Sequence, residues 1–215
     1  MSAERYVPAA GRASLTGLYD PIVALTMREH RWRPALLAEL AERLPRAGTA
    51  IDVGAGTGTF AIALAAARPD AAVIAIDGDP DILARARAKP GADAVDWRTG
   101  RAGELPIGAG AADAVSMSLL LHHLSPAAKR AALADARRVL RPGGYLHVAD
   151  WGRPRGALPR AGFLALRCLD GFEGTRDHAV GRLGELIGAA GFAQPRSWRR
   201  VTTPWGTLEL LSAAG

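Results

Sequence analysis

The sequence has few of the residues that mark secreted, membrane-spanning or thiol-dependent proteins. Cys168 is the one cysteine among 215 residues, so no internal disulfide can form. No run of eighteen apolar residues occurs, and a spanning helix needs about that length. Residues 1–12 lack the apolar core of a secretory signal. These absences predict a cytoplasmic protein with no membrane span.

Metal sites also lack support in the sequence. No His, Cys and Asp residues stand at metal-ligand spacing, and no His-Glu-x-x-His occurs, so no metal is expected. Asp150 could join other ligands, but we interpret it as a solvated strand end. Cys168 has apolar neighbours and is expected in the core.

The basic excess lies outside the middle of the chain. The formal net charge is +6, whereas residues 49–150 hold eleven basic and eleven acidic side chains. Basic flanks can contact nucleic acid, an anionic substrate or a membrane surface. Nearly all basic residues are arginine, since Lys89 and Lys129 are the only lysines. This uniform bias favours a compositional origin, and nucleic-acid binding is not expected.

Strand and helix patterns alternate through the middle of the chain. Short apolar runs predict strands at 49–53, 72–76, 92–97, 112–116 and 145–149. Helices are predicted at 59–67, after Asp79-Pro80, and from Ser125-Pro126 to about Leu140. The alternation predicts an α/β fold with a Rossmann-like doubly wound sheet, mostly parallel, with helices on both faces.

The two flanks are predicted to complete a single domain, 1–215. Residues 28–44 have helical spacing, within an N-terminal helical cap at 1–48. Residues 151–162 are interpreted as a loop, 179–190 as a helix, and 197–202 and 207–212 as closing strands that add an antiparallel C-terminal strand. The segment 151–215 would cover the substrate of a binding core at 49–150.

A glycine-rich turn, IDVGAGTG, stands at 51–58 between a predicted strand and a predicted helix. Glycine permits positive φ, and the following helix offers free N–H groups to a ligand. A dinucleotide fingerprint needs glycine at position 59, which is Thr59, and no Gly-Lys-Ser/Thr follows for a phosphate loop. These departures argue against a nicotinamide-dependent oxidoreductase. Asp77 ends the next strand, where an acid can hold both hydroxyls of a ribose.

Five ordered segments together resemble class I S-adenosylmethionine (SAM)-dependent methyltransferases. They are IDVGAGTG (51–58), VIAIDGDPDIL (73–83), GRAGELP (100–106), AADAVSMSLLLHHL (111–124) and RVLRPGGYLHVAD (138–150). The sequence is most similar to the branch with the ubiquinone/menaquinone-biosynthesis and other small-molecule methyltransferases, over about 15–150. The resemblance implies SAM as the cofactor, S-adenosylhomocysteine as its product, and a small-molecule acceptor.

The resemblance also implies which residues contact the cofactor. They are Tyr19, Asp52, Gly54, Ala55, Gly56, Gly58, Asp77, Gly78, Arg101, Ala102, Ser118 and Leu119. Arg101 stands where the family has an acid that accepts the adenine amino group, and arginine accepts no hydrogen bond. Arg101 could stack on adenine instead, or Asp96 or the main chain could take the amino group. Gly78 is a second departure, because an apolar side chain often packs on adenine there.

His122 and His123 are the candidate catalytic residues, because they follow the fourth strand at the edge where such sheets place their sites. Methyl transfer is a direct displacement that needs alignment, and a base only when the nucleophile holds its proton tightly. We hypothesise that one histidine, preferably His123, contacts or deprotonates the acceptor. A structural role for both is the alternative.

The acceptor and the assembly are less constrained. Aromatic residues at 151, 163, 172 and 198 would suit an apolar acceptor or fill the core, and arginines at 153, 155 and 160 would meet an acidic group or solvent. Methylation of RNA or protein through the basic flanks is a second hypothesis, although Ser116–Leu119 lacks the run typical of amino-group methylation of bases. A non-catalytic SAM-binding regulator is a third. A homodimer is a habit of the family.

Overall fold

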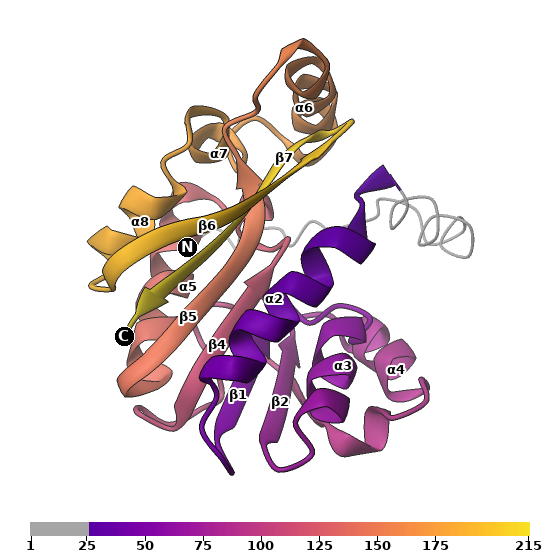
Figure 1. Ribbon diagram of the computed structural model, residues 1–215, viewed down its shortest axis with the longest axis vertical. Coiled ribbons are helices and arrows are strands. Elements are labelled where there is room, and N and C mark those ends of the chain that lie inside the picture. Colours follow the sequence, from indigo (N-terminus) through magenta and orange to yellow (C-terminus); the bar gives the residue numbers. More distant parts are fainter. Residues whose placement is uncertain (1–25) are drawn as a thin grey trace, which may run out of the picture.

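The chain, seen in a computed structural model, is described for residues 26–215, so Tyr19 lies outside the described part. Seven strands of this part form one sheet, in the order β3-β2-β1-β4-β5-β7-β6 (Figure 1). β1 to β5 pair in parallel, and β7 pairs antiparallel with both β5 and β6. The strands are β1 Thr49–Val53, β2 Ala72–Asp77, β3 Asp96–Thr99, β4 Ala112–Ser118, β5 Leu140–Gly152, β6 Ala193–Thr203 and β7 Gly206–Ala214. The predicted Rossmann-like sheet is confirmed.

Helices cover both faces of this sheet. They are α2 Glu29–Arg43, α3 Thr59–Ala67, α4 Pro80–Arg87, α5 Pro126–Val139, α6 Ala157–Asp170, α7 Arg176–Val180 and α8 Leu183–Ala189, with short 3₁₀ turns η1 Ala92–Ala94 and η2 Leu121–His123. Figure 1 shows α2 crossing the front of the central strands. Successive residues of β4 point to opposite faces, so Ala114 joins the core under α2 and α3 whereas Val115 joins the core under α5 and α8.

Two helix starts confirm the local signals in the sequence. The Asp79 side chain caps α4 by accepting from the Asp81 and Ile82 amides, and Pro80 occupies the first turn. Ser125 Oγ accepts from the Ala128 amide at 3.2 Å at the start of α5. A capping oxygen satisfies a backbone donor that has no partner inside the helix, so both boundaries follow from neighbouring residues alone.

The C-terminal third differs from the sequence prediction. α6 begins at Ala157, inside the stretch predicted as a loop, because Pro159 lies in the first turn, where its missing N–H costs nothing. The helix predicted at 179–190 is two helices, because Gly181 takes a left-handed φ of 78° between α7 and α8. β5 starts at Leu140 and continues past Ala149 to Gly152, whereas the segment 92–97 is η1 followed by β3.

The fold creates one edge where a ligand can reach several elements. β1 and β4 are neighbouring parallel strands, and the chain order of the sheet reverses between them. Ligands of open α/β sheets bind outside the carboxyl ends of strands at such a switch point. None of the helices described for residues 26–215 has the length and apolarity to cross a membrane.

Candidate functional site

The glycine turn leaves β1 at this switch point. Gly54, Gly56 and Gly58 have φ values of 71°, 54° and 75°, which residues other than glycine adopt only with backbone strain. The amides of Gly54 and Ala55 both donate to the Ile76 carbonyl, at 2.8 and 3.1 Å. These bonds tie the turn to the end of β2, so its shape is fixed before any ligand binds.

The three glycines meet different surroundings. A Cβ on Gly54 would lie 2.8 Å from Cδ1 of Leu120, and one on Gly58 would lie 2.7 Å from Cζ3 of Trp97. A Cβ on Gly56 would meet nothing within 4 Å. Gly54 and Gly58 are therefore required by packing, whereas Gly56 borders open space. A ligand that lies against bare backbone would do so at Gly56.

Alanine substitutions separate these roles. Gly58→Ala is expected to lower the free energy of unfolding by about 2–4 kcal/mol, from left-handed strain plus overlap with the Trp97 ring. Gly56→Ala carries the strain alone and should cost about 1–2 kcal/mol. Urea unfolding of the ligand-free protein measures both. Equal losses would show that Trp97 moves aside without cost.

Two carboxylates flank the turn. Asp77 accepts from the Gly56 amide at 2.8 Å and from the Asp79 amide at 3.0 Å. A carboxylate offers about four lone-pair positions, so Asp77 keeps acceptor capacity for the two hydroxyls of a ribose. Asp52 is buried and accepts from Ser116 Oγ at 2.7 Å, and no described residue bonds its other oxygen, Oδ2. These acceptors fit the cofactor that the resemblance implies.

Burial also sets the ionisation of Asp52. Desolvation raises the pKa of Asp52 to about 7, against a smaller lowering by the Ser116 hydroxyl. A buried carboxyl with this pKa is half protonated near neutral pH, so it can change between acceptor and donor at small cost. The proton on Asp52 is therefore linked to folding.

A pH-dependent stability follows from this shift. The folded chain binds the Asp52 proton more tightly than the unfolded chain, so the stability due to this group is full below pH 3.8 and is lost as pH rises towards 7. Asp52→Asn does not titrate. Its stability relative to the natural protein should rise between pH 4 and 8, by at most about 4 kcal/mol. Urea unfolding at several pH values tests this, and a constant difference would contradict the raised pKa.

The two departures at the expected adenine end lie side by side. A Cβ on Gly78 would lie 3.7 Å from Cγ of Arg101, so the arginine stem lies next to the position where the resemblance implies an apolar side chain. Arg101 is exposed, and its backbone forms an isolated antiparallel β-bridge with that of Glu104. Ala102 packs on the core. Arg98 of β3 donates to the Asp96 carboxylate at 3.0 Å and to the Pro106 carbonyl at 3.2 Å. Contacts to adenine through Arg101, Ala102 or Asp96 stay predictions.

The end of β4 carries the next group of predicted residues. Ser118 and Leu119 are half-buried, and Leu119 has a φ of 52°, in the left-handed region that a leucine rarely adopts. Strained residues cluster at binding sites, where the surrounding structure holds them. The Leu119 amide donates to the Ala149 carbonyl at 2.8 Å, which fixes this turn against β5. η2 follows at once with His122 and His123.

His122 is buried and held by a carboxylate that the sequence analysis placed wrongly. Asp150 is fully buried, not solvated, because β5 continues past it and Trp151 packs into the core. It accepts from His122 Nδ1 at 2.7 Å, from the Leu121 amide at 2.8 Å and from the Trp151 amide at 2.7 Å. Burial alone would raise the pKa of Asp150, but the neighbouring imidazoles of His122 and His178 and the hydrogen bonds from His122 and the Trp151 amide hold it well below its usual range.

The two histidines differ in how firmly they are held. His123 is exposed, and its ring lies 3.9 Å from the His122 ring, centre to centre. Part of the His123 side chain reaches solvent, but the protein packed around its ring desolvates it and lowers its pKa to about 4, with a further contribution from His122. Only His122 of this pair has a buried carboxylate to orient its ring. The geometry therefore favours His122 over the preferred candidate of the sequence analysis.

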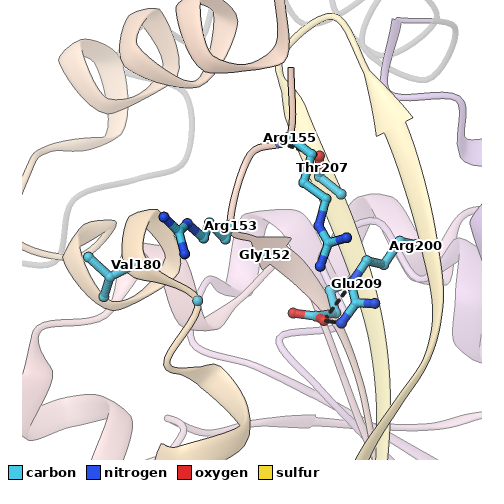
Figure 2. Close-up of a pocket in the computed structure, with 8 residues that line it drawn as sticks. Gly152, Arg153, Arg155, Val180, Arg200, Thr207 and Glu209 are labelled. Atoms are coloured by element: carbon cyan, nitrogen blue, oxygen red, sulfur yellow. Dashed lines mark hydrogen bonds and ion pairs between the residues drawn. The ribbon is translucent and has the colours of Figure 1, made fainter. Parts of the chain in front are cut away.

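A second group of residues near the end of β5 lines a cavity of about 190 Å³ (Figure 2). Arg153 and Arg155 project into it from the segment after β5, and Arg200 lies on β6. Glu209 accepts from Arg200 Nε at 2.9 Å and so neutralises one of the three charges. The remaining exposed arginines could meet an anionic group, as the sequence analysis allowed.

Other aromatic and thiol residues are assigned by burial. Trp151 and Phe163 are core residues, with their rings 6.0 Å apart, whereas Phe172 is exposed after α6. Cys168 is exposed, so its expected core position is wrong. It lies on the solvent side of α6, because Phe163 and Leu166 face the core instead.

Comparisons with known proteins give one family. A methyltransferase domain matches residues 50–144. The ubiquinone/menaquinone biosynthesis C-methyltransferase UbiE of Syntrophotalea carbinolica is 33% identical over 161 residues, which are 74% of this chain and 62% of that protein. The malonyl-[acyl-carrier protein] O-methyltransferase of Methylococcus capsulatus is 31% identical, over 90% of this chain and 68% of that protein. The chain thus spans less than two thirds of the UbiE relative.

Solved structures agree on the fold. A SAM-dependent methyltransferase from Aquifex aeolicus superposes with a TM-score of 0.65 at 21% identity, over 94% of this chain and 98% of that one. At this identity the likeness shows a shared architecture. Family membership rests on the sequence relatives.

Proposed function

The chain belongs to the class I SAM-dependent methyltransferase family, and we propose that it transfers the methyl group of SAM to a small-molecule acceptor. One observation carries the proposal. The glycine turn with Asp52 and Asp77 lies at the carboxyl end of β1, and the His122–Asp150 pair lies at the neighbouring ends of β4 and β5. The residues expected to bind the cofactor and a buried histidine–carboxylate pair thus share one edge of the sheet.

Each side chain at this edge has a role in the proposal. Asp77 would hold the ribose, the open face at Gly56 would take the methionyl part, and Asp52 would present its free oxygen to a polar group. Bound SAM supplies an electrophilic methyl carbon with a good leaving group. The protein then has to align the acceptor atom and exclude water.

His122 is our candidate for the residue that meets the acceptor. Asp150 accepts a hydrogen bond from the Nδ1–H of His122. The lone pair of the His122 ring is then on Nε2, the nitrogen that points away from the Asp150 carboxylate. His123 stands next to it on η2 and would form the rim of the same opening. A neutral imidazole held in one tautomer can accept a proton from a hydroxyl acceptor.

The acceptor is proposed to be a small molecule or a small carrier-bound group, because the names of two related proteins give acceptors of these kinds. One relative is a quinone-biosynthesis C-methyltransferase, and another is a malonyl-[acyl-carrier protein] O-methyltransferase. Arginines at the nearby cavity would suit an acceptor that also carries an acidic group. Methylation of RNA or protein, or cofactor binding without catalysis, are the competing functions.

Calorimetry followed by an acceptor screen tests the proposal. SAM and S-adenosylhomocysteine should bind one per chain, and NAD should not bind. A screen of hydroxyaromatic, quinol and carboxylate acceptors with mass detection should then give a product 14 Da heavier. NAD binding in place of SAM would overturn the cofactor assignment. SAM binding with a salt-sensitive shift of RNA on a gel, and no small-molecule product, would favour the RNA function.

A further inference from the structure

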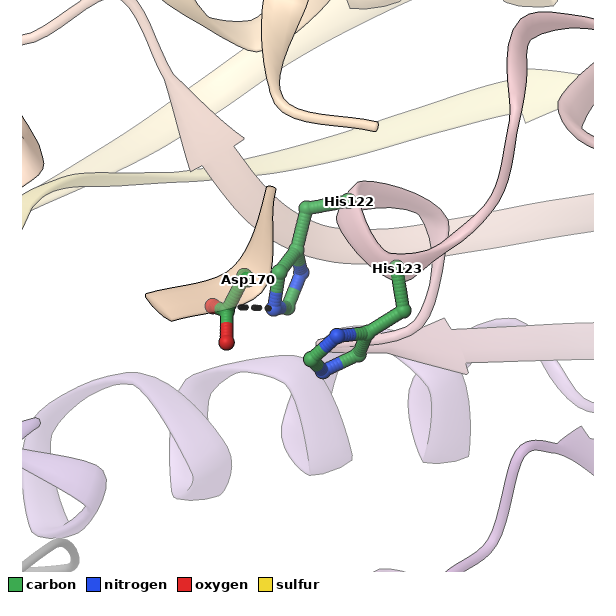
Figure 3. Close-up of side chains that lie close together, drawn as sticks. All are labelled: His122, His123 and Asp170. Carbon is green, nitrogen blue, oxygen red and sulfur yellow. Dashed lines mark ion pairs between the residues drawn. The ribbon is translucent and has the colours of Figure 1, made fainter. Parts of the chain in front are cut away.

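Three possible metal ligands converge on the open side of the His122–Asp150 pair. His122 and His123 lie on η2, and Asp170 is the last residue of α6 (Figure 3). One donor atom from each lies within 4.8 Å of those of the other two. Sequence spacing gives no hint of this set, because α6 brings Asp170 to the histidines from far along the chain.

The contact between His122 and Asp170 cannot be an ordinary hydrogen bond. His122 Nδ1 donates to Asp150, which leaves Nε2 as an acceptor. Nε2 faces Asp170 Oδ2 at 3.7 Å, too long for a hydrogen bond. Two acceptors that face each other at this distance need a donor, such as a bridging water, or a cation between them. A metal ion is the partner that both atoms could bind at once.

The surroundings of His122 match those of a histidine that binds a metal ion. Histidines that bind metals usually donate their other ring N–H to a carboxylate, as His122 does to the buried Asp150. The His123 ring lies 3.9 Å from the His122 ring, centre to centre, so a second imidazole borders the same space. The Asp170 carboxylate faces His122 Nε2 from the end of α6. A divalent ion between them would be a positive charge that all three side chains could share.

Asp170 is also held in place by the packing of its neighbours. Thr175 Oγ1 donates to the Gly171 carbonyl at 2.7 Å, directly after α6. The buried Lys129 of α5 donates to the Gly174 carbonyl and lies 3.4 Å from Asp177. The segment that carries Asp170 is therefore anchored to the core, and the three ligands are preorganised.

We propose that His122, His123 and Asp170 bind one divalent transition-metal ion of the zinc, manganese or iron class. Two imidazole nitrogens and one carboxylate oxygen suit these ions and leave coordination positions open. The site lies beside the predicted methyl-transfer opening at Ser118 and Leu119. If the proposed function holds, an acceptor oxygen would take an open position and lose its proton more readily. The expectation of no metal, which came from the spacing of ligands in the sequence, would then be wrong.

Metal titration of the untagged full-length chain tests the site. The protein is first stripped with a chelator and then titrated with Zn²⁺ by calorimetry and with Co²⁺ by absorption spectroscopy. We expect one ion per chain and a Co²⁺ spectrum typical of nitrogen and oxygen ligands. No stoichiometric binding to the folded natural protein would overturn the proposal in favour of a bridging water between His122 and Asp170.

Variants assign the ligands. Asp170→Asn and His123→Ala should each weaken Zn²⁺ binding by at least about 10-fold. Removing a group that only hydrogen-bonds to a metal ligand already costs about that much, and a ligand itself should cost more. His30→Ala removes an exposed histidine of α2, and Cys168→Ser removes the exposed thiol near Asp170. Both should bind as the natural protein does. Loss of binding in Cys168→Ser, or unchanged binding in both ligand variants, would refute the assignment.

The test separates this site from the proposed function. SAM binding is measured on the same stripped protein and depends on the glycine turn, not on the three ligands. SAM binding without metal binding would leave the methyltransferase proposal standing and remove the metal. Metal binding without SAM binding would leave the metal site standing and remove the methyltransferase proposal.

Discussion

Asp77→Ala is expected to weaken SAM binding at least about 100-fold. Each charge-assisted hydrogen bond to a ribose hydroxyl contributes about 1.5–3 kcal/mol, and two of them account for that loss. Asp77 also accepts from the Gly56 amide at 2.8 Å, so the variant frees the turn where the methionyl part would lie. Calorimetry with SAM and S-adenosylhomocysteine measures the change.

Asp79→Ala is the matched control. Asp79 stands two residues further on and caps α4, with its Oδ1 2.9 Å from the Asp81 amide, but it bonds no part of the glycine turn among the described contacts. Loss of this cap should cost about 1 kcal/mol of stability and leave SAM affinity within about threefold. If Asp77→Ala binds like Asp79→Ala, another group holds the ribose.

The sequence was sufficient where the signal is local. The glycine turn, the acid at the end of β2 and the two capped helix starts each depend on a few consecutive residues, and the structure has all of them. The strand order at the switch point also follows, because right-handed crossovers leave few alternatives. These features place the expected cofactor residues at one edge of the sheet.

The acid–base cluster could not be predicted, because its members meet only in three dimensions. From the sequence, Asp150 is interpreted as the polar end of a strand. Its burial depends on the continuation of β5 to Gly152 and on α7, which brings His178 to 3.9 Å from it. Asp170 ends a helix that the sequence pattern did not reveal. Pro154, Gly156 and Pro159 at its start are typical of a loop, although Pro159 is tolerated in the first turn of a helix.

Asp150→Ala is expected to lower the free energy of unfolding by about 3–5 kcal/mol, a large share of the stability of a single domain. The carboxylate accepts from three buried donors, the amides of Leu121 and Trp151 and Nδ1 of His122, at 2.7–2.8 Å. Alanine leaves all three without a partner. Asn keeps one acceptor oxygen, so Asp150→Asn should lose less. Urea unfolding with an unchanged m-value measures the difference.

Asp96→Ala provides the comparison for that loss. Asp96 is exposed and pairs with Arg98 at 2.7 Å on the surface, so its removal should change stability by no more than about 0.5 kcal/mol. Nitrogen NMR of the His122 ring adds a readout of its tautomer, because loss of the Asp150 acceptor in Asp150→Ala should release the Nδ1–H form. A ring that keeps its tautomer, with a stability loss no larger than that of Asp96→Ala, would mean that Asp150 does not orient His122.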